Sequence, residues 1–555
     1  MKKLWCLTLA LVLAALSIPT VMAEENSTIY RIGDYLYTLQ FNGNARIIKY
    51  FGSASTLSIP DVLDGHTVTA IDNRAFSSCL SLTSVTIPDS ITSIGDRAFD
   101  FCFSLSSVTI PNSVTTIGDN AFDSCFSLTS IAIPNSVTDM GANPFRGCRN
   151  LTRIKVSSDH PAFATINGIL FHKPTKTLVC YPQGYVKASY TIPNSVTTIG
   201  DNAFDSCSSL TSVFIPDSVT AIGDNAFHSC SSLMFIIIPN SVTTIGESAF
   251  SSCSSLASVT IPDSVTTIGE SAFYSCSSIT SITIPNGVTS IGDGAFSSCS
   301  SLASVTIPDS VTDIGANPFS RCENLTRIAM SPDHPAFATI GGVLFHKPTK
   351  TLVYYPQAYS QASYTIPNGI TTIGDGAFEF CKSLVDIIIP GSVTSIGHSA
   401  FYSCDSLTSV AIPDSVTFIG DYAFSFCDSL TSIIIPSSVT SIGHSAFYSC
   451  DSLTSVTISD SVTSIRNSVF GSCSSLTSII IPSSVTSIDA HAFSFCGSLT
   501  SVSIPDSVTT IGEDAFAKCS PNLTLTVVRD SWAAKWCKEN GVDYTYTDVL
   551  DWLTQ

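Results

Sequence analysis

Apolar residues recur along the chain with a period of 23 residues. The dipeptide Ile-Pro first falls at Ile59 and last at Ile504, and Ile458-Ser459 is the one variant, which gives 17 repeats. Two steps, after Ile133 and after Ile307, measure 59 residues instead and lie 174 residues apart. A fixed period in this range predicts a solenoid, in which each unit buries its apolar face by stacking on its neighbours. The longer period of 174 indicates an internal duplication.

Each repeat predicts a strand, a turn and a tight corner. The repeat from Leu82 to Cys102 reads LTSVTIPDSITSIGDRAFDFC. Its first apolar residues alternate with Ser84 and Thr86, as in a half-buried strand. The Pro-Asp pair favours a turn, and the glycine permits a tight bend. Asp96 is placed to cap a short helical turn that carries the phenylalanine and the cysteine of the repeat.

The two long steps contain related segments, Asp159–Tyr185 and Asp333–Tyr359. Each has apolar runs on both sides of the sequence KPTK, which predicts a β-hairpin. We therefore expect enlarged rungs with an added hairpin near residues 150–190 and 324–364. Each segment carries two histidines, at His160 and His172 and again at His334 and His346, without the spacing of a metal-binding pair. A structural role is expected for them; a weak site pairing Asp159 with His160, or Asp333 with His334, is the alternative.

The repeat pattern L-x-x-V-x-I-P-x-x-V-x-x-I-G-x-x-A-F-x-x-C resembles the BspA-like leucine-rich repeat family. The resemblance covers nearly all of the chain after its first residues. It implies a β-rich solenoid of the α/β leucine-rich repeat type over residues 55–520, with a hairpin cap at 24–54 and a strand-helix-strand cap at 521–555. The family is associated with adhesion to host matrix proteins, epithelial cells or other microbes, and the resemblance implies no catalytic residues.

The charge balance and the N-terminus indicate which partners and which location to expect for the protein. The chain has 43 acidic and 24 basic residues, for a net charge of -19, which argues against nucleic acid and anionic membranes as partners. Residues 1–23 carry two lysines, a short apolar run and small residues near Ala23, which predicts a cleaved secretory signal. No second long apolar run follows, so we expect a secreted or cell-surface protein without a transmembrane segment.

Three residue types form columns in register with the repeat. Seventeen of the 20 cysteines, from Cys79 to Cys519, are expected to be buried thiols whose side chains point the same way, with a partial disulfide ladder as the alternative. The column phenylalanines are expected to stack in the core. The acids before each corner are expected to be N-caps, although they could instead hold a cation such as calcium; they include Asp201, Asp224, Glu247, Glu270 and Asp293. No cofactor, metal site or catalytic residue is predicted.

The outward strand positions are mostly serine and threonine, with one cluster of exceptions. Phe214, Met234, Phe235 and Ile237 interrupt these polar columns in adjacent repeats, which predicts a ligand-contact patch, with tolerated sequence drift as the alternative. The leading function is an adhesin-like scaffold that recognises host matrix or cell-surface proteins, glycans or other microbial cells. A structural spacer or polymer-binding rod is the second hypothesis. An enzyme that uses the hairpin histidines is the third, and we expect that the chain is not an enzyme.

Overall fold

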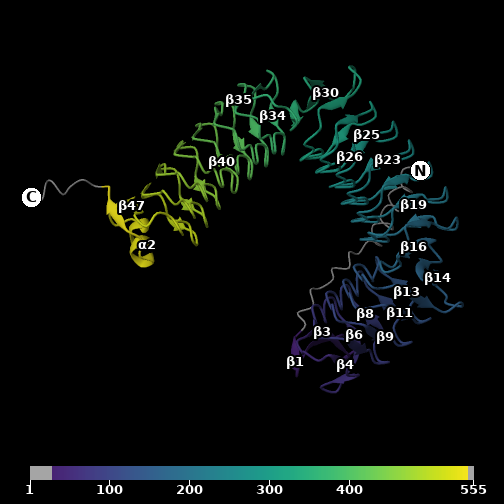
Figure 1. Ribbon diagram of the computed structural model, residues 1–555. Coiled ribbons are helices and arrows are strands. Elements are labelled where there is room, and N and C mark those ends of the chain that lie inside the picture. The colour runs from purple at the N-terminus through teal and green to yellow at the C-terminus, as the bar shows by residue number, and fades with distance from the viewer. Residues whose placement is uncertain (1–27, 548–555) are drawn as a thin grey trace, which may run out of the picture. The chain divides into compact units, whose positions relative to one another are not determined.

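The computed structural model describes residues 28–547 as a β-solenoid of about 22 turns with very little helix (Figure 1). The predicted signal at residues 1–23 lies outside the described residues. Contacts divide the chain into two compact units. The first runs to Leu128 and includes Ala132–Pro144, and the second comprises Thr129–Ile131 and the residues from Phe145 onward.

The first unit begins with antiparallel strands and continues as parallel turns. Strands β1 (Tyr30–Ile32), β2 (Tyr35–Leu39) and β3 (Ala45–Tyr50) pair antiparallel, and β3 pairs parallel with β6 (His66–Ile71). The short β5 (Val62–Leu63) pairs with β6. Two sheets follow the turns of this unit: β4 (Thr56–Ser58), β7 (Ser84–Thr86) and β9 (Ser107–Thr109) in one, and β6, β8 (Ser93–Ile94), β10 (Thr116–Ile117) and β12 (Asp139–Met140) in the other. Strand β11 (Ser130–Ile133) contains residues of both units.

In the second unit each turn contributes two short strands to parallel columns. The first strands lead into the turn, which carries a proline in most repeats, and are β13 (Arg153–Val156), β17 (Ser189–Thr191), β19 (Ser212–Phe214), β21 (Phe235–Ile237), β23 (Ser258–Thr260), β25 (Ser281–Thr283), β27 (Ser304–Thr306), β29 (Arg327–Ala329), β33 (Ser363–Thr365), β35 (Asp386–Ile388), β37 (Ser409–Val410), β39 (Ser432–Ile435), β41 (Ser455–Ile458), β43 (Ser478–Ile480), β45 (Ser501–Ile504) and β47 (Thr524–Val527).

The second strands lead into the corner, which begins with a glycine in most turns. They are β16 (Thr177–Cys180), β18 (Thr198–Ile199), β20 (Ala221–Ile222), β22 (Thr244–Ile245), β24 (Thr267–Ile268), β26 (Ser290–Ile291), β28 (Asp313–Ile314), β32 (Thr351–Tyr354), β34 (Thr372–Ile373), β36 (Ser395–Ile396), β38 (Phe418–Ile419), β40 (Ser441–Ile442), β42 (Ser464–Ile465), β44 (Ser487–Ile488) and β46 (Thr510–Ile511). The hairpin strands β14 (Phe163–Ile166), β15 (Ile169–His172), β30 (Phe337–Ile340) and β31 (Val343–His346) are added to this column.

The number of turns exceeds the 17 repeats because some turns lack the Ile-Pro dipeptide. Strand β29 lies between β27 and β33, where Met330 and Ser331 stand in place of Ile-Pro. Each step of 59 residues therefore contains two turns, one of ordinary length and one that carries the hairpin. The predicted solenoid with two hairpin-bearing enlargements is confirmed, and only its count of turns was low.

The core is a column of stacked aromatic rings flanked by aliphatic side chains. The ring centroids of Phe204 and Phe227 lie 4.8 Å apart, and the next pairs along the stack, through Phe250 and Phe273, lie 5.2 and 5.3 Å apart. The rings are almost parallel, with interplanar angles of 9°, 3° and 6°. This spacing matches the separation of neighbouring strands, so each turn places one ring directly on the last.

The corner after the glycine is not the short helical turn that the sequence predicted. Asn225 and Ser229 have φ angles of 54° and 56°, in the left-handed region. The backbone N–H groups of Asn225, Phe227 and Ser229 donate to carbonyls of the next turn at 2.8, 2.7 and 2.7 Å. Between them, the N–H of His228 donates to the carbonyl of Asn225 at 3.0 Å, within the same turn. The corner is thus a third hydrogen-bonded face between turns, and the prediction of a helix was wrong.

The last described elements are β47, helix α2 (Trp532–Asn540) and β48 (Tyr544–Tyr546), which pairs parallel with β47. The Ser531 hydroxyl caps α2 by accepting from the N–H of Ala534 at 3.1 Å, and Gly541 ends it at a φ of 68°. Trp536 packs edge-on against Phe516, the last ring of the phenylalanine column, at 6.2 Å. The predicted domain limits at residues 24–54 and 521–555 stay predictions.

Candidate functional site

The strand face of the second unit exposes rows of hydroxyl side chains. Parallel pairing puts equivalent residues of successive turns side by side, for example Ser189 beside Ser212 and Thr283 beside Thr306. The inward residues between these rows, such as Val213 and Ile236, are buried. The face is therefore flat, polar and regular wherever the repeat is unbroken.

The four predicted patch residues lie together on this face and point outward. Phe214 is the direct register partner of Ile237, and Phe235 is the partner of Ser212 on one side and Ser258 on the other. Phe214, Met234, Phe235 and Ile237 have exposed fractions of 60%, 54%, 53% and 65%. Since neighbouring strands lie roughly 4.8 Å apart, these side chains form one contiguous apolar surface, which we call the strand-face patch.

A shallow groove begins beside the strand-face patch and crosses four turns. It has a volume of about 840 Å³ and runs from β23, the register partner of β21, to Met330. Serine and threonine hydroxyls line its strand side, and Asp263 and Asp309 stand at the turn side. We call it the strand-face groove. The patch and the groove thus form one continuous surface of the second unit.

Three further exposed isoleucines on the strand face do not extend the patch. Ile388, Ile434 and Ile480 are exposed by 56%, 66% and 73%. They lie on β35, β39 and β43, so a complete turn separates each from the next. Each is a single apolar side chain in a polar surface, which is common on soluble proteins.

The acids before the corners bond to the following turn rather than capping their own. The N–H of Asp224 donates to Asp201 Oδ1 at 2.9 Å, and the N–H of Glu247 donates to Asp224 Oδ1 at 2.8 Å. His398 takes the same position later in the chain, where its Nδ1 accepts from the N–H of Asp421 at 3.0 Å. The predicted structural role of this column is correct, but the predicted N-cap was wrong because no helical turn follows.

The cysteine column also bonds from turn to turn. Cys230 Sγ donates to the carbonyl of Phe204 at 3.1 Å, and Cys253 Sγ donates to the carbonyl of Phe227 at 3.1 Å. Burial raises the pKa of the Cys253 thiol to about 12. All cysteines in the described residues are free thiols. Cys230 and Cys253 thus fill the core and donate to a carbonyl of the preceding turn.

His334, one of the hairpin histidines, is completely buried. Its Nδ1 accepts from the N–H groups of Ala336 and Phe337 at 3.2 and 3.1 Å. The proton therefore sits on Nε2, which donates to the carbonyl of Pro308 at 2.9 Å. Lys347 Nζ donates to the carbonyl of His334 at 2.6 Å. His334 thus anchors the hairpin with both ring nitrogens engaged.

His160 repeats this arrangement in the first enlarged segment. It is also completely buried, and its Nδ1 accepts from the N–H groups of Ala162 and Phe163 at 3.2 and 3.1 Å. Within residues 28–547, no group of three or more His, Cys, Asp or Glu side chains is arranged to hold a metal ion. The weak alternative of an Asp-His site at Asp159 or Asp333 gains no support from this geometry.

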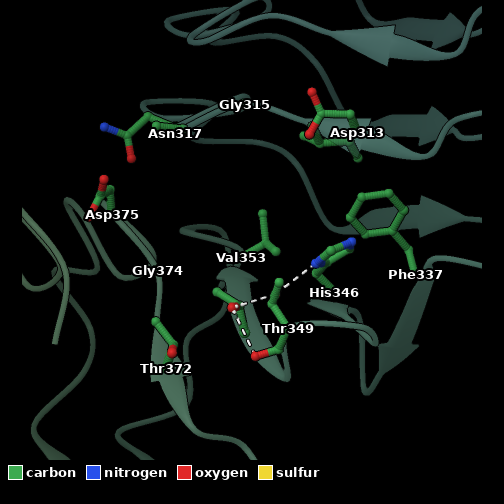
Figure 2. A pocket seen from close by; sticks show the side chains of 13 residues that line it. Asp313, Gly315, Asn317, Phe337, His346, Thr349, Val353, Thr372, Gly374 and Asp375 are labelled. Atoms are coloured by element: carbon green, nitrogen blue, oxygen red, sulfur yellow. Dashed lines mark hydrogen bonds between the residues drawn. The ribbon is translucent and has the colours of Figure 1, made fainter. Parts of the chain in front are cut away.

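A pocket of about 310 Å³ lies where the second hairpin interrupts the column of second strands (Figure 2). Among the described strands, β28 is the last of its sheet, and the next sheet starts with β30, β31 and β32. The hairpin strand β31 takes the edge of β32 at which the column would otherwise continue. The space between β28 and β32 is the pocket, which we call the hairpin pocket.

Polar groups line the hairpin pocket on several sides. Figure 2 shows Asp313 near Phe337 on one side and Asp375 on the other, with His346 and Thr349 between them. His346 Nδ1 and Thr349 Oγ1 are 2.7 Å apart, and Thr349 Oγ1 lies 2.8 Å from Thr351 Oγ1. This chain of hydrogen bonds fixes the His346 ring at the pocket wall.

The hairpin pocket was not predicted from the sequence. A signal was available in the turn before the hairpin, which reads VTDIGANPF where ordinary turns read VTTIGDNAF. Asp313 and Ala316 are products of that departure, where the ordinary turn has Thr198 and Asp201, and both line the pocket. Asn317 Oδ1 is buried and has no hydrogen-bond partner among the described residues.

Comparisons with solved structures find leucine-rich repeat proteins of bacteria. A leucine rich cell surface protein from Faecalibacterium prausnitzii is 27% identical, covers 94% of this chain and 99% of its own, and has a TM-score of 0.25. A leucine-rich repeat protein from Bacteroides ovatus is 23% identical over 90% of this chain and 100% of its own, with a TM-score of 0.35. One from Eubacterium ventriosum is 22% identical over 72% and 95%, with a TM-score of 0.33.

The search of curated proteins finds no match. In the described part of the chain, no helix has the length and apolar character needed to cross a membrane. The family model described as BspA type leucine rich repeat region (6 copies) matches residues 53–177, 186–277, 266–358, 353–473 and 394–524. These matches cover most of the chain and agree with the repeat, the stacked turns and the hydrogen-bonded columns. The chain therefore belongs to the BspA-type leucine-rich repeat family.

Proposed function

We propose that the chain is a secreted or surface-exposed, adhesin-like recognition scaffold that binds proteins or glycans of host or microbial surfaces through the strand face of its second unit. The observation that carries this proposal is the strand-face patch. Phe214 and Ile237 are register partners, and both side chains are more than half exposed. A contiguous exposed apolar cluster on an otherwise polar face is typical of a contact site for a partner.

The surroundings of the patch suit the centre of an interface. Phe214 and Phe235 are large and rigid, and the serine and threonine rows around them can accept or donate hydrogen bonds at the rim. Binding energy in protein interfaces concentrates in such central aromatic side chains, while polar neighbours exclude water. Their backbone is held on both sides by parallel strands, so little conformational entropy is lost when they are covered.

The shape of the strand-face groove favours a ligand that is extended. It continues from β23 for four turns beside the patch, and its turn side carries Asp263 and Asp309. A ligand that packs on the patch and runs along the groove would meet hydroxyl groups on one side and carboxylates on the other. Polymers and extended protein segments have this shape.

The proposal also holds that the chain is not an enzyme. It is supported by the engagement of His160 and His334 in buried bonds to the backbone. The column acids and cysteines are likewise bonded to adjacent turns. These histidines, acids and cysteines, which are residue types capable of acid-base or nucleophilic chemistry, are thus used to hold the fold.

The first prediction concerns the patch. The purified chain is screened against matrix proteins, cell-surface glycans and polysaccharides, and each ligand found is titrated against a Phe214→Ser, Phe235→Ser double variant. Removal of two central aromatic contacts is expected to cost about 2 kcal/mol or more, which weakens binding at least about 30-fold. Circular dichroism and thermal unfolding check that the variant is folded.

A matched control uses Ile388→Ser with Ile480→Ser. These substitutions also remove two exposed apolar side chains from the strand face, but at isolated positions. Loss of binding in the patch variant alone supports the proposal. Equal loss in both variants, or saturable binding that neither variant changes, would reject the patch as the contact site. If no ligand class binds, the structural spacer becomes the better hypothesis.

A further inference from the structure

The hairpin pocket lies where the column of second strands is interrupted by the second hairpin. Along the first-strand column the turn of β29 pairs with β27, so stacking of that face continues up to the second enlargement. On the second-strand face, β28 has β26 on one side, and among the described strands none pairs with it on the other. The edge of β28 is thus open at the pocket, next to Asp313, which ordinary turns do not have.

The side chains at this opening are mainly hydrogen-bond acceptors. Asp313 replaces the serine or threonine of ordinary turns, as at Ser290, its register partner in the preceding strand. Asp375 forms the opposite wall, although its Oδ1 already accepts from the N–H of His398 at 2.7 Å. Asn317 Oδ1 lies nearby without a partner among the described residues. The lining residues, all within the described part of the chain, include no lysine or arginine. A ligand here must supply donors and must not be an anion.

The positions of these acceptors restrict the shape of the ligand. Asp313 and Asp375 lie on different sides of the pocket (Figure 2), so no single donor head-group at one end of a ligand serves both. Donors must be distributed around the perimeter of the ligand. Ile314 and Val353, together with the buried ring of Phe337, supply apolar surface at the same pocket. The complement is a small ring with hydroxyl groups at its edge and C–H groups on its faces.

The volume of the pocket agrees with a ligand of this size. About 310 Å³ is at the lower end of the range for small-molecule sites, so it accommodates one sugar ring and not an oligosaccharide. Thr349 and His346 add groups that both donate and accept, and their mutual bond keeps them in place before a ligand arrives. A site with fixed polar groups loses less entropy on binding.

We propose that the hairpin pocket binds a single uncharged hexose ring, such as the terminal sugar of a surface glycan. The inference is independent of the strand-face patch, because it concerns other turns and another face of the solenoid. Uronic and sialic acids are excluded by the two carboxylates. A lysine or arginine side chain of a partner protein would pair with only one of the two carboxylates.

The test uses the whole chain and local hydrogen exchange. Deuterium uptake of peptides that cover residues 313–317 and 343–353 is measured with and without glucose, galactose, mannose and N-acetylglucosamine. Saturation-transfer NMR titrations give the affinity for each sugar. We expect one or more of these hexoses to protect both segments, and glucuronic acid to protect neither.

Two variants and a control connect binding to the pocket. Asp313→Ser restores the residue of an ordinary turn, and Thr349→Val removes the hydroxyl that connects His346 to Thr351. Each is expected to weaken hexose binding about tenfold, because a sugar hydroxyl loses its partner. Glu323→Gln removes an exposed charge from the same turn, outside both the hairpin pocket and the strand-face groove, and is expected to change binding less than twofold.

Three results would overturn the proposal. The first is the absence of protection by every hexose, and the second is hexose affinity that stays the same in Asp313→Ser and Thr349→Val. The third is protection of the two segments by arginine methyl ester but by no hexose, which would assign the pocket to a cationic side chain of a protein partner. None of these results bears on the strand-face patch, so the two proposals are tested separately.

Discussion

At the scale of single residues, the repeat fixes what each side chain touches. Gly246 shows why the corner glycine recurs. The sequence suggested that it permits a bend, but its φ lies outside the left-handed region. A Cβ placed there would lie 2.5 Å from Asp224 Oδ1 and 2.6 Å from the carbonyl carbon of Gly223. The glycine is needed because the preceding turn occupies the space of a side chain.

The prediction at this scale is that Gly246→Ala destabilises the chain. Two of the nearest atoms belong to the backbone of the preceding turn, so relief requires that the two turns separate, at a cost of about 1–3 kcal/mol. Chemical denaturation monitored by circular dichroism measures the change. Gly391→Ala is the control, because no atom lies within 4 Å of its added Cβ. An equal loss in both variants would show that the close approach is not the cause.

At the scale of elements, the strands were predictable and the corners were not. The alternation in residues 82–87 predicts a half-buried strand from local sequence alone, and β7 is found there. The corner after Gly223 was assigned a helical turn because its spacing of apolar residues suits one. Its N–H groups in fact bond alternately to the same turn and to the next. Hydrogen-bond acceptors that lie one turn away cannot be inferred from a local sequence pattern, so the corner could not be predicted correctly in this way.

The element that offers a direct test is the second hairpin. His334→Ala removes the acceptor of two buried N–H groups and the donor to Pro308. Leaving these groups unpaired and opening a cavity is expected to cost about 2–4 kcal/mol. Faster hydrogen exchange of residues 336–346 would report it. His346→Ala serves as the comparison, since His346 is only half-buried, and it should alter exchange in this segment much less.

At the scale of the whole molecule, repetition made the solenoid, the stacked phenylalanines and the exposed patch predictable. Phe214 and Phe235 could be placed on one face because their positions in the repeat are known. The hairpin pocket could not be predicted. It depends on β28 lacking a paired strand on one side, and the sequence of a single repeat does not show whether the next turn pairs with it. Repetition also adds together small contributions to the free energy of unfolding, because the same group is buried in each successive turn.

The cysteine column illustrates this multiplication and predicts alkaline sensitivity. Burial raises the pKa of Cys253 and of Cys299 to about 12, above the ordinary thiol value of 9.0. Above pH 9 the unfolded chain therefore loses thiol protons that the folded chain retains, so the free energy of unfolding falls as pH rises from about 9 towards 12. Each such thiol contributes up to about 1.4 kcal/mol per pH unit.

Denaturant titrations at pH values from 8 to 11 measure this dependence. A Cys253→Ala, Cys299→Ala variant should lose less stability over the same interval than the original chain does. Stability that is flat or rising between about pH 9 and pH 11 would contradict the prediction. So would an identical slope in the variant, because tyrosines and lysines would then account for the whole effect.

The bonds between turns also bear on how such a chain changes over generations. Asp224 accepts from the residue 23 positions later, and Cys253 donates to the residue 26 positions earlier. Every ordinary turn therefore needs only an adjacent turn of the same kind. A gene that gains or loses a whole repeat by unequal recombination would encode a protein with all of these bonds intact. The solenoid can thus vary in length with little selection against it, whereas the hairpin pocket is inherited only if its turns stay together.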